Sequence, residues 1–136
     1  MRIRTWSLVG CTLLVIFAAL VFALWARASR LKTFRETEQL VHGDPSHGPD
    51  KIRKYGCYSC HTISGVAGAN GLVGPSLNGI AQRVFIAGEL PNNPENITRW
   101  IQHPRSIEPH TAMPEMGVTD EDSRDIAAYL YTLGER

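Results

Sequence analysis

Cys57-Tyr58-Ser59-Cys60-His61 is the stretch of this sequence that decides its fold. Two thiols three positions apart lie on the same side of one helical turn. Both can form thioether bonds with the vinyl groups of one haem, and the histidine that follows can then bind the iron. Because this spacing is the signature of c-type haem attachment, it predicts one covalent haem c on Cys57 and Cys60, with His61 as an iron ligand.

The same cysteines fit two other kinds of site, half of a zinc site or a thioredoxin-like redox pair. A structural zinc site needs a fourth ligand beyond Cys57, Cys60 and His61. The only other cysteine, Cys11, lies in an apolar segment, so a second histidine would have to be the fourth zinc ligand. A redox pair should follow a strand in a βαβ unit, and no such pattern surrounds these residues. Haem attachment is therefore the favoured interpretation.

A segment without charged residues covers residues 6–26, with Trp6 and Trp25 at its ends. As a helix it would span about 31 Å, close to the hydrocarbon thickness of a bilayer, and tryptophans favour the membrane interface. A signal peptide is the alternative, because Ala-Arg-Ala at residues 26–28 resembles a cleavage site. The apolar run is longer than such peptides usually have. The sequence therefore favours a retained transmembrane anchor over residues 1–28, held in the lipid bilayer.

The charge distribution excludes one class of partner. All 13 acidic residues and 10 of the 14 basic residues fall after position 30, so residues 31–136 carry a net charge of about −3. Because there is no basic patch, we expect no nucleic-acid partner.

Residues 29–49 are predicted to form a helical stalk and a short linker. Helix-favouring residues continue beyond the apolar segment until Gly43 begins a run of stop signals. The linker histidines, His42 and His47, are expected to be solvated. The remaining residues, 50–136, are few for a domain, and a covalently held haem would supply the apolar mass that so small a core lacks.

Local signals within residues 50–136 predict helices joined by long loops. Residues 50–55 suit a short helix before the cysteines. Asn93 with the following proline marks a helix start, and Pro104 marks its end. Thr119 and Asp122 form an acidic variant of the capping box for the last helix. No stretch alternates with a period of two, so the fold class is predicted to be all-α.

A haem with two axial ligands needs a partner for His61, and a thioether is one option. Met113 and Met116 lie in an extended, proline-containing stretch without an amphipathic pattern. Met113 is favoured because Pro114 biases its backbone toward an extended conformation. His103 and His110 lie close to this loop in sequence, so a haem with two histidine ligands remains an alternative.

The chain resembles a class I c-type cytochrome of the bacterial, membrane-anchored kind, over about residues 48–133. The matching elements occur in the family's order: C-x-x-C-H at residues 57–61, Gly74-Pro75-x-Leu77, Trp100, Met113-Pro114 and Tyr129-Leu130. The resemblance implies a small cytochrome c-like domain enclosing one covalent haem and preceded by an N-terminal transmembrane helix.

The resemblance also implies roles for residues around the iron. The carbonyl of Pro75 would accept a hydrogen bond from His61 Nδ1–H, which orients the ring and raises its basicity. Leu77 would pack on the haem face. Arg83 and Trp100 would approach the propionates, where a cation and an indole N–H stabilise carboxylates.

Two further expectations follow from the resemblance. The last helix would cross the helix before the haem motif, with Ile52 or Tyr55 meeting Tyr129 or Leu130. The glycine-rich insert at residues 63–73 departs from the shortest family members and leaves the docking face undefined.

With both axial positions filled, no site remains for a substrate or dioxygen, which predicts an electron carrier and not an enzyme in its own right. The resemblance implies service to a respiratory chain, with a terminal oxidase or a quinol-oxidising complex as partner. The haem domain is expected on the periplasmic side of a bacterial inner membrane. A haem enzyme or gas sensor with an open distal site is one alternative, and a structural haem subunit is another.

Overall fold

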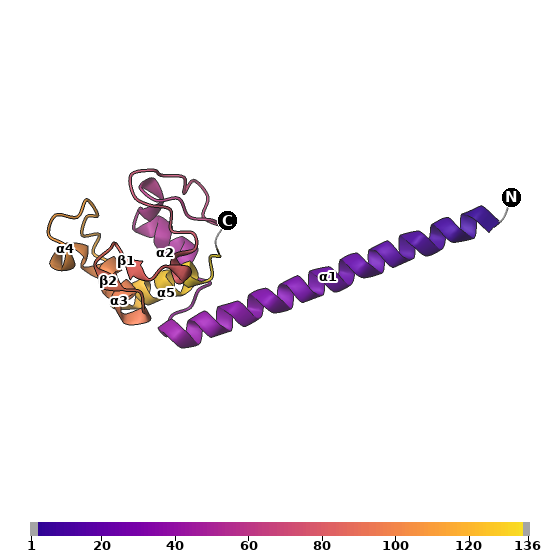
Figure 1. Ribbon diagram of the computed structural model, residues 1–136, viewed down its shortest axis with the longest axis horizontal. Coiled ribbons are helices and arrows are strands. Elements are labelled where there is room, and N and C mark those ends of the chain that lie inside the picture. Colours follow the sequence, from indigo (N-terminus) through magenta and orange to yellow (C-terminus); the bar gives the residue numbers. More distant parts are fainter. Residues whose placement is uncertain (1–2, 135–136) are drawn as a thin grey trace. The chain divides into compact units, whose positions relative to one another are not determined.

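A computed structural model describes residues 3–134 of the chain, and for residues 3–10 it describes the backbone alone. The chain divides into two compact units, Met1–Thr33 and Phe34–Arg136. The long helix α1 (Ile3–Val41) begins in the first unit and ends in the second (Figure 1).

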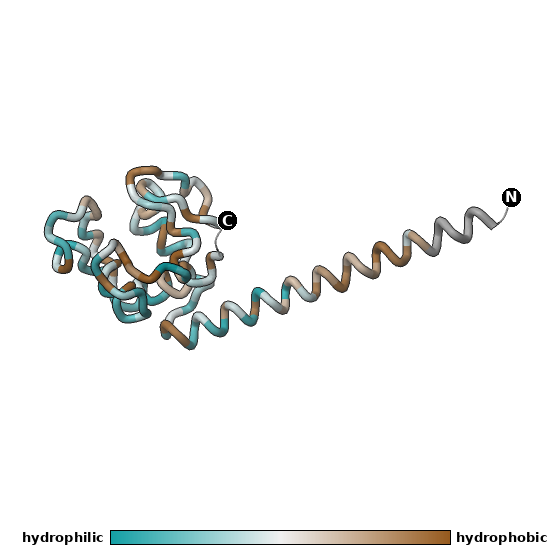
Figure 2. The backbone as a smooth tube through the Cα atoms, in the orientation of Figure 1, coloured by the Kyte–Doolittle hydropathy of each residue, from teal (hydrophilic) through white to brown (hydrophobic). Residues whose placement is uncertain are grey.

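Helix α1 is the one element, among the described residues, that is long and apolar enough to cross a membrane. Its apolar window has a mean hydropathy of 2.2, and none of that window is buried. Figure 2 shows this apolar stretch giving way to more hydrophilic residues toward the end of the helix. The side chain of Trp6, on which part of the anchor prediction depends, lies outside the described residues.

The second unit is mostly helical, as the sequence predicts. After α1 come α2 (Gly48–Lys54), two short 3-10 turns (Cys57–Ser59 and Ile80–Gln82), β1 (Phe85–Ile86), β2 (Leu90–Pro91), α3 (Pro94–Gln102), α4 (Pro104–Ile107) and α5 (Asp120–Tyr131). The strands β1 and β2 pair antiparallel, with Ile86 opposite Leu90. This hairpin was not predicted, because two-residue strands are too short to show an alternating pattern.

The caps of α3 and α5 form where the sequence predicts them. The Asn93 side chain accepts a hydrogen bond from the N–H of Asn96 at 2.8 Å, and α3 ends before Pro104. Thr119 Oγ1 accepts from the N–H of Asp122 at 3.2 Å. The Asp122 carboxylate, however, bonds to side chains of α2, so only the threonine half of the predicted capping box is present.

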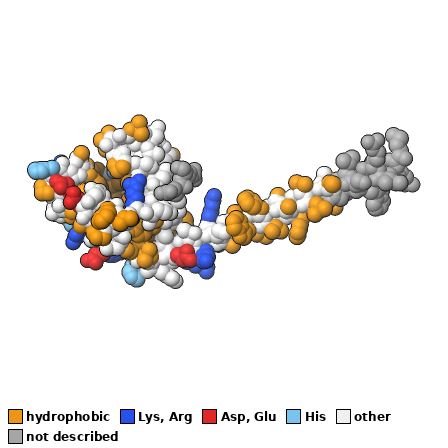
Figure 3. Space-filling model, viewed as in Figure 1, with side chains coloured by type: hydrophobic (Ala, Val, Ile, Leu, Met, Phe, Trp, Pro, Cys, Tyr) orange, Lys and Arg blue, Asp and Glu red, His pale blue; other side chains and the backbone are white. Residues whose placement is uncertain are grey.

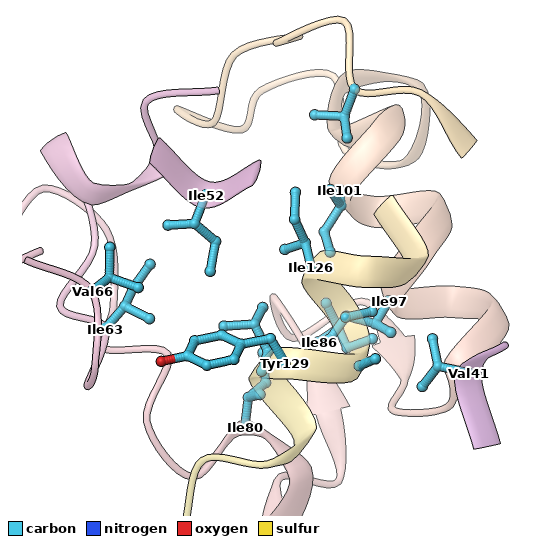
Figure 4. Packing of buried hydrophobic residues seen from close by; sticks show 14 of the residues in the cluster. Val41, Ile52, Ile63, Val66, Ile80, Ile86, Ile97, Ile101, Ile126 and Tyr129 are labelled. Carbon is cyan, nitrogen blue, oxygen red and sulfur yellow. The ribbon is translucent and has the colours of Figure 1, made fainter. Parts of the chain in front are cut away.

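Helix α5 packs against both α2 and α3, and their inward faces form the core (Figure 4). Ile52 of α2, Ile97 of α3 and Ile126 of α5 are each at most 2% exposed. Full burial of such a side chain contributes about 1.5–3 kcal/mol. Buried residues also come from the end of α1, the loop after the cysteines, the second 3-10 turn and β1: Val41, Ile63, Val66, Ile80 and Ile86.

Helices α2 and α5 pack against each other as predicted, and they approach closely at Gly48. A β-carbon at Gly48 would lie 2.2 Å from Cβ of Tyr129, so only glycine permits this approach. Ile52 lies in the shared core, as expected. The Tyr55 hydroxyl instead meets α5 at Asp122, donating to Oδ2 at 2.6 Å. The sequence did not identify Gly48, which it assigned to a linker.

The segment predicted as a linker packs on α5. A β-carbon at Gly43 would lie 2.3 Å from the backbone of Arg124, and the N–H of Asp44 donates to Asp125 Oδ1 at 2.8 Å. His47 is exposed, with Nδ1 3.4 Å from Asp125 Oδ2. This connection is therefore a packed corner of the domain and not a free linker.

Candidate haem site

The haem-attachment sequence forms one tight turn directly after α2. Gly56 adopts a left-handed conformation, with φ of +71°, and this reverses the chain into the 3-10 turn Cys57–Ser59. The N–H groups of Cys60 and His61 both bond to the carbonyl of Cys57, at 3.2 and 3.0 Å. The two cysteines consequently belong to a single helical turn, as the spacing predicts.

The His61 ring is held by the proline that the family resemblance singled out. Its Nδ1 lies 2.7 Å from the carbonyl oxygen of Pro75. Because a carbonyl only accepts, Nδ1 is the donor of this bond, and in the neutral ring Nε2 then has the lone pair that a metal would need. The imidazole is therefore set in the tautomer that suits an iron ligand.

Two glycines bring the following loop into contact with the attachment turn. A β-carbon at Gly71 would lie 2.5 Å from the carbonyl oxygen of Ser59, and one at Gly74 would lie 2.4 Å from Cε1 of His61. The N–H of Gly74 also donates to the carbonyl of Cys60 at 2.8 Å. Sequence reasoning placed Gly71 in the glycine-rich insert and Gly74 in the family element Gly74-Pro75-x-Leu77, but it predicted neither contact, because spacing alone does not show a close approach.

The thiols have the properties of attachment sites more than of a redox pair. Cys57 and Cys60 are both free. Burial raises the pKa of the Cys57 thiol, whereas reactive redox cysteines depend on a lowered pKa. The zinc interpretation loses support as well. Among the residues that the structure describes, no group of three or more His, Cys, Asp or Glu side chains is arranged to hold a metal ion.

The other residues assigned by resemblance lie around the same loop and core. Leu77 and Trp100 are half-buried and pack against the hydrophobic core. The Arg83 guanidinium donates to the carbonyl of Ser76 and, at 3.4 Å, to that of Asn78. In the structure Arg83 is thus hydrogen-bonded to the loop that contains Pro75 and Leu77.

The two methionines differ in their surroundings. Met113 is half-buried, and its N–H donates to Thr111 Oγ1 at 3.3 Å. Met116 is 40% exposed, and its Cε lies 3.9 Å from the position of a β-carbon at Gly56. The end of the Met116 side chain thus lies near Gly56, and Met113 as the second ligand stays a prediction.

The competing histidines lie on the surface. His103 is exposed, with Nδ1 3.7 Å from Glu115 Oε2. His110 is also exposed, next to Glu108, which accepts its backbone N–H at 2.8 Å. Neither placement favours a haem with two histidine ligands.

A family model described as cytochrome c matches residues 48–134. The chain belongs to the cytochrome c family. Cytochrome c2 of Rhodopila globiformis is 35% identical over 104 residues, which cover 67% of this cytochrome and 94% of that protein. No solved structure matches the cytochrome.

Two other relatives of this cytochrome are named cytochrome c oxidase subunit 2. The protein of Alkalihalophilus pseudofirmus is 30% identical over 110 residues, covering 80% of the cytochrome and 30% of the relative. The protein of Bacillus sp. strain PS3 is 27% identical over 108 residues, covering 76% and 30%. The cytochrome therefore spans about 30% of the length of these two relatives.

Family membership makes this an electron-carrying c-type cytochrome, and the family implies a covalent haem c. The residues present fit that group: two free thiols on one turn, an imidazole oriented by a carbonyl, and a half-buried methionine in a loop.

Proposed function

We propose that this cytochrome is a membrane-anchored, single-haem carrier of electrons in a respiratory chain. Cys57 and Cys60 would attach the haem, and His61 and Met113 would be its axial ligands. The observation that carries the proposal is the 2.7 Å contact between His61 Nδ1 and the Pro75 carbonyl, one turn from two free thiols. A second-shell bond of this kind fixes the ring of a metal-binding histidine and increases its basicity.

The bound haem supplies a one-electron couple, and the surrounding residues of this chain determine its environment. His61 and Met113 would hold the iron, and the neutral thioether of Met113 would raise its reduction potential. If both residues bind the iron, no position would be open for a substrate. Leu77 would lie on the haem face, and Arg83 and Trp100 would stabilise the propionates. This arrangement suits electron transfer and not catalysis.

The apolar helix α1 supports a place at the membrane. We propose that residues 6–26 form a single-pass anchor in a bacterial inner membrane, with the haem domain on the periplasmic side. The length and hydropathy of the helix support the anchor. The need for haem attachment beyond the cytoplasmic membrane supports the orientation.

The two relatives named cytochrome c oxidase subunit 2 support a terminal oxidase as partner. The cytochrome would pass electrons to such an oxidase, or work as a subunit within it, and receive them from a quinol-oxidising complex. It would be a carrier in either case and not an enzyme by itself.

Spectroscopy of the purified, full-length protein in detergent tests the carrier role. We expect reversible one-electron oxidation, the red charge-transfer band of methionine-ligated ferric haem, and no binding of CO or cyanide at the concentrations that saturate open haem sites. A missing band together with ready CO binding would favour the haem enzyme or gas sensor. Membrane fractionation with a haem stain tests the anchor, because a soluble haem protein beginning near Ser29 would show cleavage.

A further inference from the structure

The Asn92 side chain joins the end of α5 to the second 3-10 turn. Its Nδ2 donates to the carbonyl of Ile80 at 2.6 Å and to that of Arg83 at 2.9 Å. Its Oδ1 accepts from the hydroxyl of Tyr131, the last residue of α5, at 2.7 Å. Because carbonyls can only accept, one orientation of the amide makes all three bonds. We call the bonds among these four residues the Asn92 network.

The Asn92 network lies at the edge of the hydrophobic core. Ile80 is 6% exposed, and Tyr131 packs against the core. Figure 3 shows hydrophobic side chains on the surface of this unit as well, and a polar group among apolar neighbours costs free energy unless its hydrogen bonds are made. Burial raises the pKa of the Tyr131 hydroxyl to about 12, so the hydroxyl stays protonated and remains a donor in ordinary buffers. Each member of the network therefore depends on the others.

Arg83 connects the Asn92 network to the loop that orients His61. Its backbone carbonyl is held by Asn92, and its guanidinium donates to the carbonyl of Ser76. Ser76 directly follows Pro75, whose carbonyl accepts from His61 Nδ1 at 2.7 Å. A path of hydrogen bonds, with one covalent step from Ser76 to Pro75, thus leads from the end of α5 to the imidazole.

We propose that Asn92 and Tyr131 are positioning residues for His61, acting through Arg83 and the loop that contains Pro75. The proposal rests on the proposed function in one respect, that His61 binds the iron. It adds which residues, distant in sequence, keep the hydrogen bond of that ligand closed. The guanidinium reaches Ser76 only while the Arg83 backbone is held, so loss of the Asn92 bonds should loosen the loop.

A loosened loop should change the properties of the ligand. The hydrogen bond at Nδ1 makes a metal-binding histidine a stronger electron donor, which favours ferric iron. A ligand keeps its geometry only when the residues behind it are themselves locked by packing and hydrogen bonds. Loss of the Asn92 network should therefore raise the reduction potential and open the Nδ1 proton of His61 to solvent.

The test uses the full-length, haem-loaded, ¹⁵N-labelled protein, reduced and in detergent. NMR measures the rate at which the Nδ1 proton of His61 exchanges with solvent, which reports how often this one bond opens. Asn92→Ala removes the network's centre, and Tyr131→Phe removes only a hydroxyl. Asn96→Ala is the matched control, because Asn96 is also half-buried and its Nδ2 donates to a carbonyl outside the turn, that of Pro91, at 2.9 Å.

We expect Asn92→Ala to speed the exchange about tenfold and Tyr131→Phe about threefold, factors that loss of one or two hydrogen bonds supplies. Both variants should have a raised reduction potential. Asn96→Ala should change the exchange rate less than about twofold, since its bond lies off the path.

A double-mutant cycle tests whether Asn92 acts through Arg83. Arg83→Leu alone should speed the exchange about as much as Asn92→Ala does. Adding Asn92→Ala to Arg83→Leu should change the rate less than about twofold further, because residues in one network are not additive. Additive effects would show that Asn92 does not act through the guanidinium and would overturn the proposal.

Equal exchange rates in Asn92→Ala and Asn96→Ala would also overturn the proposal. If Asn92→Ala does not fold, Tyr131→Phe decides, because it keeps the aromatic ring in the core; an exchange rate equal to that of the unaltered protein would sink the idea. The haem spectrum separates the two levels. A spectrum that His61→Ala leaves unchanged contradicts the proposed function, whereas a normal spectrum with unchanged exchange in Tyr131→Phe contradicts the positioning role alone.

Discussion

Gly74 lies directly against the imidazole of His61. A β-carbon at this glycine would lie 2.4 Å from Cε1, 2.7 Å from Nδ1 and 2.9 Å from Nε2. The same ring donates a hydrogen bond to Pro75, the next residue along the chain. Gly74 thus packs against the His61 ring, and the carbonyl of Pro75 orients it.

Gly74→Ala should therefore disturb the histidine. The added methyl group would overlap the ring, which can move only by lengthening its hydrogen bond to Pro75. We expect a loss of about 1–3 kcal/mol in the free energy of unfolding and a raised reduction potential, because a weaker hydrogen bond makes the imidazole a weaker electron donor to ferric iron. Denaturant unfolding and redox titration measure the two effects. Gly134→Ala, whose β-carbon would meet nothing within 4 Å, should match the unaltered protein in both. Equal values for the two variants would contradict this account.

The buried carboxylate of Asp122 connects α5 to α2. Its side chain is 6% exposed, with Lys51 Nζ at 2.5 Å from Oδ1 and Lys54 Nζ at 2.7 Å from Oδ2. Hydrogen bonds from Lys51, Lys54 and Tyr55 hold the pKa of Asp122 far below its ordinary value of 3.8. We expect Asp122→Asn to lower the free energy of unfolding by about 1–2 kcal/mol, since the exposed lysine ends are screened by water.

The effect of Asp122→Asn should depend on pH in a defined direction. A carboxyl with a lowered pKa in the folded state stabilises the fold above its unfolded pKa and loses that contribution as pH falls toward the folded pKa. The difference between the unaltered protein and the variant should be full above about pH 5 and shrink below about pH 4. Asp120→Asn, at an exposed position paired with Arg124 in the same first turn, should change stability by less than about 0.5 kcal/mol. A difference that grew toward low pH would refute the assignment.

Local sequence rules predicted the features that depend on neighbouring residues. The caps at Asn93 and Thr119, and the single turn that holds Cys57 and Cys60, follow from side chains within a few positions. The contacts at Gly48, Gly71 and Gly74 could not be predicted in this way. Each of these positions must be glycine because another segment of the folded chain lies too close for a side chain. From the sequence alone, the same glycine could equally mark a turn.

The end of α1 is a further feature that spacing did not show. The family model begins at residue 48, yet Val41 is 3% exposed within the core of the second unit. We expect Val41→Ala to lower the free energy of unfolding by about 2 kcal/mol through lost burial and a residual cavity. Leu40→Ala, at the adjacent and 56% exposed position, should change it by less than about 0.5 kcal/mol. If the two variants unfold alike, the end of α1 is not part of the core.

The choice between the two methionines gives the most direct test of the haem site. Met113 lies half-buried in its loop, whereas Met116 is 40% exposed and its methyl group lies near Gly56. Met113→Ala should abolish the charge-transfer band of the ferric protein, lower the reduction potential because a thioether ligand raises it, and open the iron to CO. Met116→Ala should keep the band and exclude CO, with at most a small loss of stability from the exposed position. Visible spectroscopy of both variants, oxidised and then reduced under CO, decides the ligand. The reverse pattern would assign Met116 to the iron. A histidine would be the ligand if the unaltered protein lacked the band and if His103→Ala or His110→Ala changed its spectrum.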